Sequence, residues 1–174
     1  VKELKNIHRG RIAAYKERYP HAEYYRANPR DPHSPLWAQE ADCAFPCATQ
    51  NEINHKDAQN LVENNIILVA EGANMPTCEE GVQHFLENNI LFAPAKAANA
   101  GGVAVSGLEM AQNGSRIRWS RDKVDEQLHR IMKKIHTTCL EYAKQYSTEG
   151  NYVDGANIAG FMRAANAMLD QGYV

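Results

Sequence analysis

The sequence predicts an α/β fold in which part of a doubly wound parallel sheet precedes an α-helical carboxyl-terminal tail. Between residues 42 and 93, short apolar runs alternate with helical patterns, as expected of parallel strands joined by helices. The segment Glu63-Asn64-Asn65-Ile66 recurs as Glu87-Asn88-Asn89-Ile90 after 24 residues, which is about one strand plus one helix. Beyond residue 102, apolar residues recur only at helical spacing, so we place the boundary between the two parts there.

The elements of the layered part follow from these runs. Strands are predicted over 42–45, 66–70 and 90–93, and helices over 55–64 and 77–87. Each asparagine pair of the repeat suits a helix stop, because asparagine tolerates the left-handed conformation. The run over 66–70 lacks polar alternation, which predicts a central strand covered on both faces.

The two ends of the chain are predicted less directly. Residues 1–19 carry apolar side chains at helical spacing and predict one amphipathic helix, and 22–25 is a candidate for a short edge strand. Residues 28–37 predict a loop with little packed structure, because they contain three prolines: Pro29, Pro32 and Pro35. In the tail, helices are predicted over 103–119, 120–146 and 152–169.

Composition excludes several functional classes. The formal net charge is −2, and no block of Lys and Arg exceeds a pair, which argues against a nucleic-acid partner. No apolar run approaches the roughly 18 residues that a membrane helix needs, and the amino end lacks the apolar core of a signal peptide. We therefore expect a cytoplasmic protein without a membrane partner.

Cysteine and histidine spacing does not predict a metal site. The four cysteines fit neither a zinc motif nor a redox C-x-x-C, so we expect free thiols. His129 and His136 lie seven residues apart on one predicted helix, without a third ligand nearby in the sequence. No bound metal is expected.

Three short amide-bearing segments recur at nearly constant spacing along the predicted sheet. They contain Gln50, Asn74 and Asn99, which are 24 and 25 residues apart, and we expect each to be a loop that directly follows a strand. The carboxyl ends of parallel strands meet at one edge, where open α/β sheets bind ligands. Neutral amides beside small residues suit a polar, uncharged group such as a nicotinamide or a ribose.

Each of these segments also has a simpler interpretation. Asn74 and Asn51 could cap helices, and Lys96 could be a catalytic base or an ordinary solvated lysine. Gly101-Gly102 could expose backbone amides to an anion, with Ser106 donating in the same direction. Alternatively, the glycines form only a tight turn, and Ser106 bonds back within its own helix.

The same segments resemble the hexameric bacterial-type glutamate dehydrogenases. The resemblance covers essentially the whole chain in family order and rests on four long motifs, which are 46–52, 70–77, 93–110 and 155–161. It implies that residues 1–102 are part of a Rossmann-like nucleotide-binding region. It also implies that 103–174 comprise a pivot helix with helices packed on it, and that the chain corresponds to the carboxyl-terminal portion of such an enzyme.

The resemblance implies a role for each matched site residue. Ala48 and Gln50 would line the cofactor cleft, Asn74 would contact the ribose on the nicotinamide side, and Asn99 would lie near the nicotinamide. On the following helix, two residues would bind the substrate. These are Val103, against the glutamate side chain, and Ser106, which would hydrogen-bond a glutamate carboxylate.

The intact family enzyme would interconvert L-glutamate with 2-oxoglutarate and ammonia, using NAD or NADP, as a homo-oligomer that is a hexamer when intact. No G-x-G occurs in this chain, and the family's catalytic lysine and aspartate belong to the amino-terminal domain. We therefore assign no catalytic residue here and expect the chain alone to be inactive. An isolated, non-catalytic binding or oligomerisation domain of Rossmann-like fold is the alternative.

Overall fold

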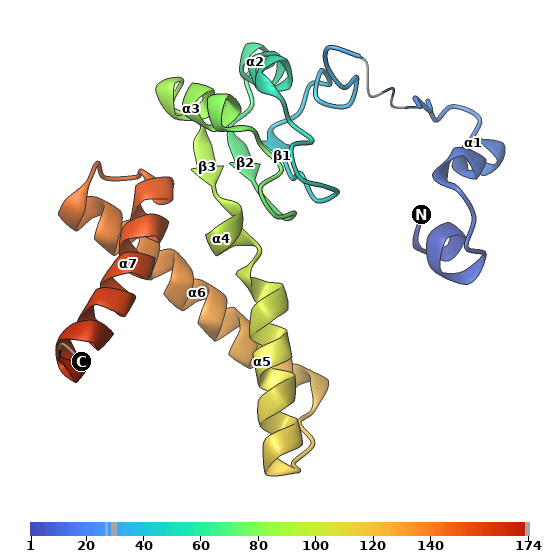
Figure 1. The fold of residues 1–174 in the computed structure, drawn as a ribbon. Coiled ribbons are helices and arrows are strands. Elements are labelled where there is room, and N and C mark those ends of the chain that lie inside the picture. Colours follow the sequence, from blue (N-terminus) through green and yellow to red (C-terminus); the bar gives the residue numbers. More distant parts are fainter. Residues whose placement is uncertain (27, 29–30, 173–174) are drawn as a thin grey trace.

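The computed structural model describes residues 1–26, 28 and 31–172 and contains a three-stranded parallel sheet. The strands are β1 (Cys43–Ala44), β2 (Leu68–Ala70) and β3 (Leu91–Ala93), in the order β1-β2-β3. Helix α2 (His55–Glu63) joins the first two strands and α3 (Glu79–Glu87) joins the last two, as Figure 1 shows. The predicted α/β class with a parallel sheet is confirmed.

The helix stops predicted from the repeated asparagine pairs are also confirmed. Asn65 and Asn89 adopt φ values of 59° and 57°, in the left-handed region. The Ile66 N–H then donates to the Leu61 carbonyl at 3.1 Å, which is the closing bond of a Schellman turn. At its other end, α2 begins with a capping box between Asn54 and a neighbouring aspartate.

The hydrophobic core lies between the sheet and helices α2 and α3. Val69 and Phe92 are in register on the inner face of the sheet, and the ring of Phe92 stacks on that of Phe85 at 5.8 Å between centroids. On the opposite face, Phe45 is 59% exposed and Leu91 is 61% exposed. Within the central strand itself, Val69 is fully buried, whereas Leu68 and Ala70 are only half-buried because α2 and α3 both pack on one side. The prediction that this strand is covered on both faces is therefore not met in the described chain.

The amino-terminal residues do not form the single helix that their pattern predicts. They form a π-helical turn (Glu3–Ile7), a 3-10 turn (Ile12–Ala14) and the short helix α1 (Tyr15–Arg18), none of which contains a buried residue. Arg9 adopts a φ of 48°, and this left-handed residue breaks the helix.

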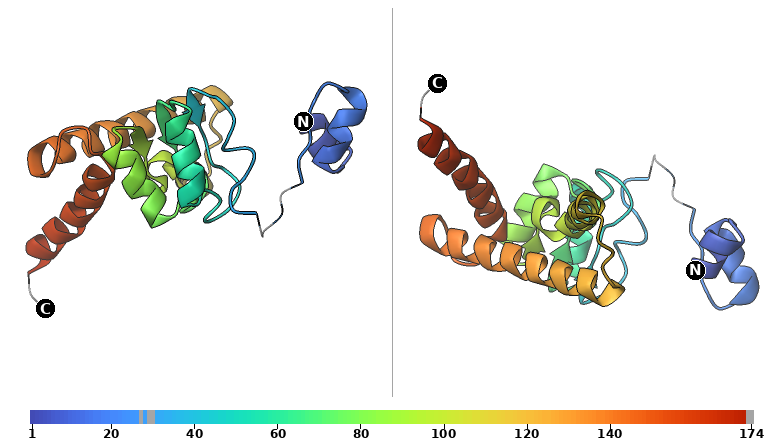
Figure 2. Two further views of the ribbon diagram at one scale, coloured as in Figure 1. Left: turned by 90° about the horizontal axis from the view of Figure 1, so that it is seen from above. Right: turned by 90° about the horizontal axis from the view of Figure 1, so that it is seen from below.

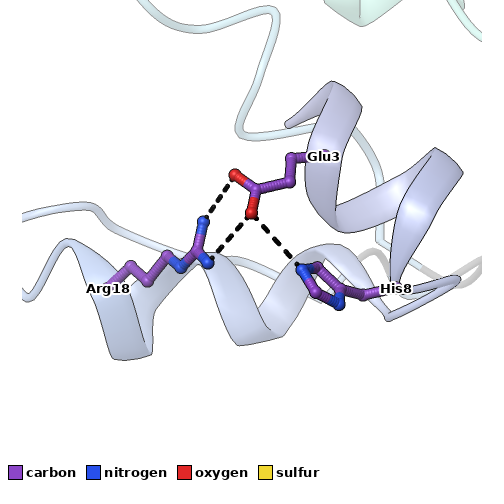
Figure 3. A network of polar contacts seen from close by, with 3 residues as sticks. All are labelled: Glu3, His8 and Arg18. Atoms are coloured by element: carbon purple, nitrogen blue, oxygen red, sulfur yellow. Dashed lines mark hydrogen bonds and ion pairs between the residues drawn. The ribbon is translucent and has the colours of Figure 1, made fainter.

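An ion-pair network draws the separate turns together. The Glu3 carboxylate accepts two hydrogen bonds from Arg18, at 2.9 and 3.2 Å, and faces His8 at 3.4 Å, as Figure 3 shows. The hydrogen bonds from Arg18, followed by that from His8, lower the pKa of Glu3 to about 2. A periodic apolar pattern cannot reveal such a long-range pairing, which explains why the prediction failed.

Two other amino-terminal predictions need correction. Residues 22–25 form no strand. Pro29 lies outside the described residues, but the later part of the proline-rich loop is packed: Trp37 is buried, and its Nε1–H donates to the Glu52 carbonyl at 3.1 Å. The Ser34 N–H donates to the buried carboxylate of Asp57 at 2.6 Å.

The tail consists of α4 (Ala95–Ala98), α5 (Ala100–Ser115), α6 (Arg121–Tyr146) and α7 (Tyr152–Gln171). Helix α5 therefore begins and ends earlier than predicted, and it stops where Arg116 turns left-handed. The amino-terminal part of α7 packs closely on the carboxyl-terminal part of α6, and the two helices diverge beyond this contact, as Figure 2 shows. None of the helices in the described part of the chain is long and apolar enough to cross a membrane.

Candidate functional site

The loops that follow β1 and β2 are locked together at the carboxyl edge of the sheet. The Ile53 N–H donates to the Pro76 carbonyl at 2.9 Å, and the Gly72 N–H donates to the Pro46 carbonyl at 2.9 Å. Gly72 is needed here, because a Cβ at this position would lie 2.4 Å from the Sγ of Cys47. The close approach of the two backbones fixes the distance between the loops.

A hollow of about 580 Å³ lies between these two loops. Its lining includes three of the predicted cofactor-binding residues, Ala48, Gln50 and Asn74. Glu52 stabilises the loop after β1, because its Oε1 accepts a hydrogen bond from the Ala48 N–H at 2.8 Å. Gln50 and Asn74 thus line one cavity, although they come from different loops.

Asn74 and Asn99 form a hydrogen-bonded pair beside this hollow. The Nδ2 of Asn99 donates to the Oδ1 of Asn74 at 2.7 Å and to the Ala73 carbonyl at 3.2 Å. Within the described chain, the Nδ2 of Asn74 and the Oδ1 of Asn99 have no partner. The predicted convergence of the amides at one edge is therefore observed as geometry.

The alternative roles in helix capping are wrong. Helix α2 is capped by Asn54 and not by Asn51, which instead adopts a left-handed φ of 53°. Helix α3 begins after Cys78, four residues beyond Asn74. Neither asparagine side chain therefore caps the helix that follows it.

The third amide segment is not a loop, which corrects the prediction. The alanine-rich residues after β3 form helix α4, because alanine favours a helix and Pro94 suits its start. Asn99 is the one residue between α4 and α5, and Gly101-Gly102 occupy the first turn of α5. The tight-turn interpretation of the glycines is therefore also wrong.

The two predicted substrate-binding residues lie on the open surface of α5. Val103 is 79% exposed. The hydroxyl of Ser106 donates to the Gly102 carbonyl at 3.2 Å, so Ser106 bonds back within its helix, as the alternative interpretation predicts. Neither residue lines the hollow beside Asn74.

A buried carboxylate that sequence reasoning missed lies behind the asparagine pair. Glu71 is 5% exposed and accepts from the Thr77 N–H at 3.2 Å and from the Ala95 N–H at 2.8 Å. The available signal was an acidic residue directly after a buried strand and before a glycine, where an unpaired charge would be costly. Its partners, however, lie 6 and 24 residues away and cannot be read from local pattern.

A second hollow, of about 910 Å³, is lined by residues of α3, α4 and α7 and by both asparagines of the pair. Lys96 lines it, and the Nζ of Lys96 donates to the side-chain oxygen of Asn157 on α7. Cys78 also lines it, and burial raises the pKa of that thiol, which keeps it protonated. Lys96 thus connects α4 to α7, and its side chain is exposed rather than desolvated.

The four cysteines are free thiols, as predicted. No group of three or more His, Cys, Asp and Glu side chains with the geometry of a metal site is found among the residues that the structure covers.

Comparison with known proteins agrees with this architecture. The sequence model of the Glutamate/Leucine/Phenylalanine/Valine dehydrogenase family matches residues 1–172. Among similar proteins, the NAD(P)-specific glutamate dehydrogenase of Xylanibacter ruminicola is 48% identical over 172 residues, which are 99% of this chain and 37% of that protein. The NAD-specific glutamate dehydrogenase of Bacteroides fragilis is 47% identical over 163 residues, which are 94% of this chain and 35% of that protein.

Solved structures show the same likeness. The glutamate dehydrogenase of Plasmodium falciparum superposes with a TM-score of 0.90 at 43% identity, over 99% of this chain and 36% of that one. This chain thus spans about 37% of the length of the curated relatives that it matches. Because the family model matches residues 1–172 and the fold agrees, the chain belongs to the Glutamate/Leucine/Phenylalanine/Valine dehydrogenase family.

Proposed function

We propose that this chain forms one wall of the cofactor and substrate cleft of a glutamate dehydrogenase. The enzyme would interconvert L-glutamate with 2-oxoglutarate and ammonia by hydride transfer to or from NAD or NADP. The hydride chemistry belongs to the cofactor when it is bound. The residues of this chain would bind the cofactor, orient it and exclude water from it.

The hydrogen-bonded pair of Asn74 and Asn99 is the observation that carries this proposal. Because Asn99 donates to Asn74, the pair presents one free amide donor, the Nδ2 of Asn74, and one free acceptor, the Oδ1 of Asn99. The donor suits a ribose hydroxyl oxygen. The acceptor suits the amide N–H of a nicotinamide carboxamide, so one pair could hold both groups of the reactive half of the cofactor.

The other predicted residues take positions around this pair. Ala48 and Gln50 line the adjoining hollow, whose uncharged surface fits the ribose and nicotinamide rather than a phosphate. Val103 and Ser106 would meet glutamate when a second domain closes over α5. The Ser106 hydroxyl would then turn from the Gly102 carbonyl toward the substrate carboxylate, exchanging a weak bond for a charge-assisted one.

Proton transfer would be supplied from outside this chain, since the resemblance places the family's catalytic lysine and aspartate in the amino-terminal domain. We therefore expect no glutamate turnover by the chain alone. In the intact enzyme we expect the division near residue 102, a cytoplasmic location and a homo-oligomer, with a hexamer as the complete form. The choice between NAD and NADP is left to measurement.

Titration of the purified chain with NADH and NADPH, followed by nicotinamide fluorescence, tests the proposal. Replacing Asn99→Ala removes both the acceptor and the bond that orients Asn74, so the affinity should fall about 10- to 100-fold. The control Asn113→Ala removes an exposed asparagine of α5 and should leave the affinity unchanged. Equal affinity for the two variants would contradict the assignment of the asparagine pair.

A non-catalytic binding or oligomerisation domain is the second candidate. It is favoured by the open sheet face, where Phe45 and Leu91 remain exposed in the described chain. Analytical ultracentrifugation separates the two functions. A chain that forms dimers or larger species through this face and binds neither cofactor would support the second candidate and reject the first.

A further inference from the structure

The buried carboxylate of Glu71 links the two segments that carry the asparagine pair. Its Oε1 accepts from the Thr77 N–H at 3.2 Å, which closes the loop that contains Asn74. Its Oε2 accepts from the Ala95 N–H at 2.8 Å. Ala95 is the first residue of α4, and Asn99 directly follows that helix. The Glu71 side chain therefore bonds both the loop that contains Asn74 and the helix that precedes Asn99.

We infer that Glu71 is the positioning residue that sets the Asn74–Asn99 hydrogen bond and, through it, the affinity for the cofactor. The part of the inference that concerns the cofactor rests on the proposed function, whereas the part that concerns the pair rests on geometry alone. Glu71 acts through the backbone at both ends. Its two hydrogen bonds fix the position of the Asn74 loop relative to α4. That position sets the distance of 2.7 Å between the Nδ2 of Asn99 and the Oδ1 of Asn74.

The arrangement needs a carboxylate, because two N–H donors converge on its two oxygens. A glutamine of the same length has one oxygen and one NH₂ group. In the variant Glu71→Gln, the NH₂ group would face either the Thr77 N–H or the Ala95 N–H, and two donors would be opposed in a buried site. The variant keeps the volume of the side chain, so it tests the hydrogen bonds rather than the packing.

The first experiment is nuclear magnetic resonance on the 19.5 kDa chain, with Glu79→Gln as the matched control. Glu79 is an exposed carboxylate in the first turn of α3, close to the same site, and no hydrogen bond links it to either segment. In Glu71→Gln, the Thr77 and Ala95 amide protons should exchange about tenfold faster or more. The side-chain NH₂ resonances of Asn99 should shift toward those of a solvated amide, whereas Glu79→Gln should change neither.

A second variant keeps the test decisive if Glu71→Gln does not fold. Ala95→Pro deletes the N–H that donates to Oε2 and leaves the charge of Glu71 in place. Proline suits the first position of a helix, and Pro94 already has the extended ψ of 150° that a following proline favours. The variant should shift the Asn99 resonances in the same direction as Glu71→Gln.

The double variant checks that the two changes act on one contact. With proline at position 95, the NH₂ group of the introduced glutamine would no longer meet a donor there. The combined effect on the Asn99 resonances and on cofactor affinity should therefore be smaller than the sum of the single effects. Purely additive effects would show that Glu71 and Ala95 act separately and would overturn the inference.

Cofactor titration completes the test and keeps the two proposals apart. Glu71→Gln and Ala95→Pro should each weaken NADH or NADPH binding about tenfold, and Glu79→Gln should not. If the unmutated chain binds neither cofactor, the proposed function fails, and the Asn99 resonances alone decide the role of Glu71. Unchanged Asn99 resonances in Glu71→Gln, or unchanged affinity despite released amides, would overturn the inference.

Discussion

The loops around the asparagine pair and helix α5 differ in how firmly the rest of the chain holds them. The loops are joined by backbone hydrogen bonds and lie against a core in which Ile53, Val69 and Phe85 are fully buried. Helix α5 has no buried residue along its whole length. The proposed cofactor wall is thus rigid, whereas the proposed substrate residues lie on an element that a second domain could move.

This difference separates two tasks of the proposed cleft. Orienting a nicotinamide requires donors and acceptors at fixed positions, which the interlocked loops provide. Closing the cleft over glutamate requires an element that can change its place, and an exposed helix joined to α4 through the single residue Asn99 suits that task. Four predictions, from the largest expected effect to the smallest, break or sharpen the comparison.

Removing the central ring of the core should have the largest effect. Phe85→Ala should reduce the free energy of unfolding by about 3–5 kcal/mol, because a fully buried phenylalanine leaves a cavity. The control Phe161→Ala removes a ring that is 69% exposed on α7 and should change it by less than about 0.5 kcal/mol. Urea denaturation measures the free energy of unfolding of both variants. Equal decreases would show that the layered part is packed no more tightly than the tail.

The tail has its own close contact, between α6 and α7. A Cβ at Gly155 would lie 2.0 Å from the Cys139 carbonyl oxygen, so Gly155→Ala should cost about 1–3 kcal/mol by forcing the helices apart. Gly160 lies on the same helix, and a Cβ there would meet nothing within 4 Å. Gly160→Ala should therefore raise the free energy of unfolding by up to about 1 kcal/mol. Thermal denaturation would refute the contact if both variants behaved alike.

The interlocked loops can be loosened without touching the asparagines. Gly72→Ala should cost about 1–2 kcal/mol, because the new methyl group meets the Sγ of Cys47. In a Cys47→Ala background the same change should cost at least about 0.5 kcal/mol less, since the obstructing atom is absent. A double-mutant cycle by urea denaturation measures this coupling, and strict additivity would contradict the observed proximity.

The smallest effect is expected at the amino terminus. The pKa of Glu3 is lowered from 4.5 to about 2, so the Glu3–Arg18 pair stabilises the turns fully above pH 4.5 and is lost as the pH falls toward 2. Nuclear magnetic resonance signals of Arg18 should shift over that range, and Glu3→Gln should abolish the shift. Because these turns bury no residue, loss of the Glu3–Arg18 pair should not change the denaturation midpoint of the core.

Much of the fold could be predicted because its signals are local. The apolar runs gave the parallel strands, and the repeated asparagine pairs gave the helix stops at Asn65 and Asn89. The even spacing of Gln50, Asn74 and Asn99 placed the amides at one edge. Each of these inferences uses only side-chain periodicity or the conformational preference of single residues, which neighbouring sequence is sufficient to express.

Most of the failed predictions involve partners that are distant in the sequence. The amino-terminal turns, which are separated at Arg9, are held together by the pairing of Glu3 with Arg18. The proline-rich loop is packed because Trp37 reaches the Glu52 carbonyl. The extra helix before Asn99 was missed for a different reason, because an alanine-rich stretch of four residues carries little periodic signal.

By itself, the sequence determined the α/β class, the strand order along the chain, the amide-bearing edge and the family motifs. Only the tertiary structure decided that Asn99 donates to Asn74, leaving one donor and one acceptor free, and that Glu71 lies behind the pair. The physical reason is that a hydrogen bond between segments depends on where the folded core places two backbones. A pattern within either segment does not contain that distance.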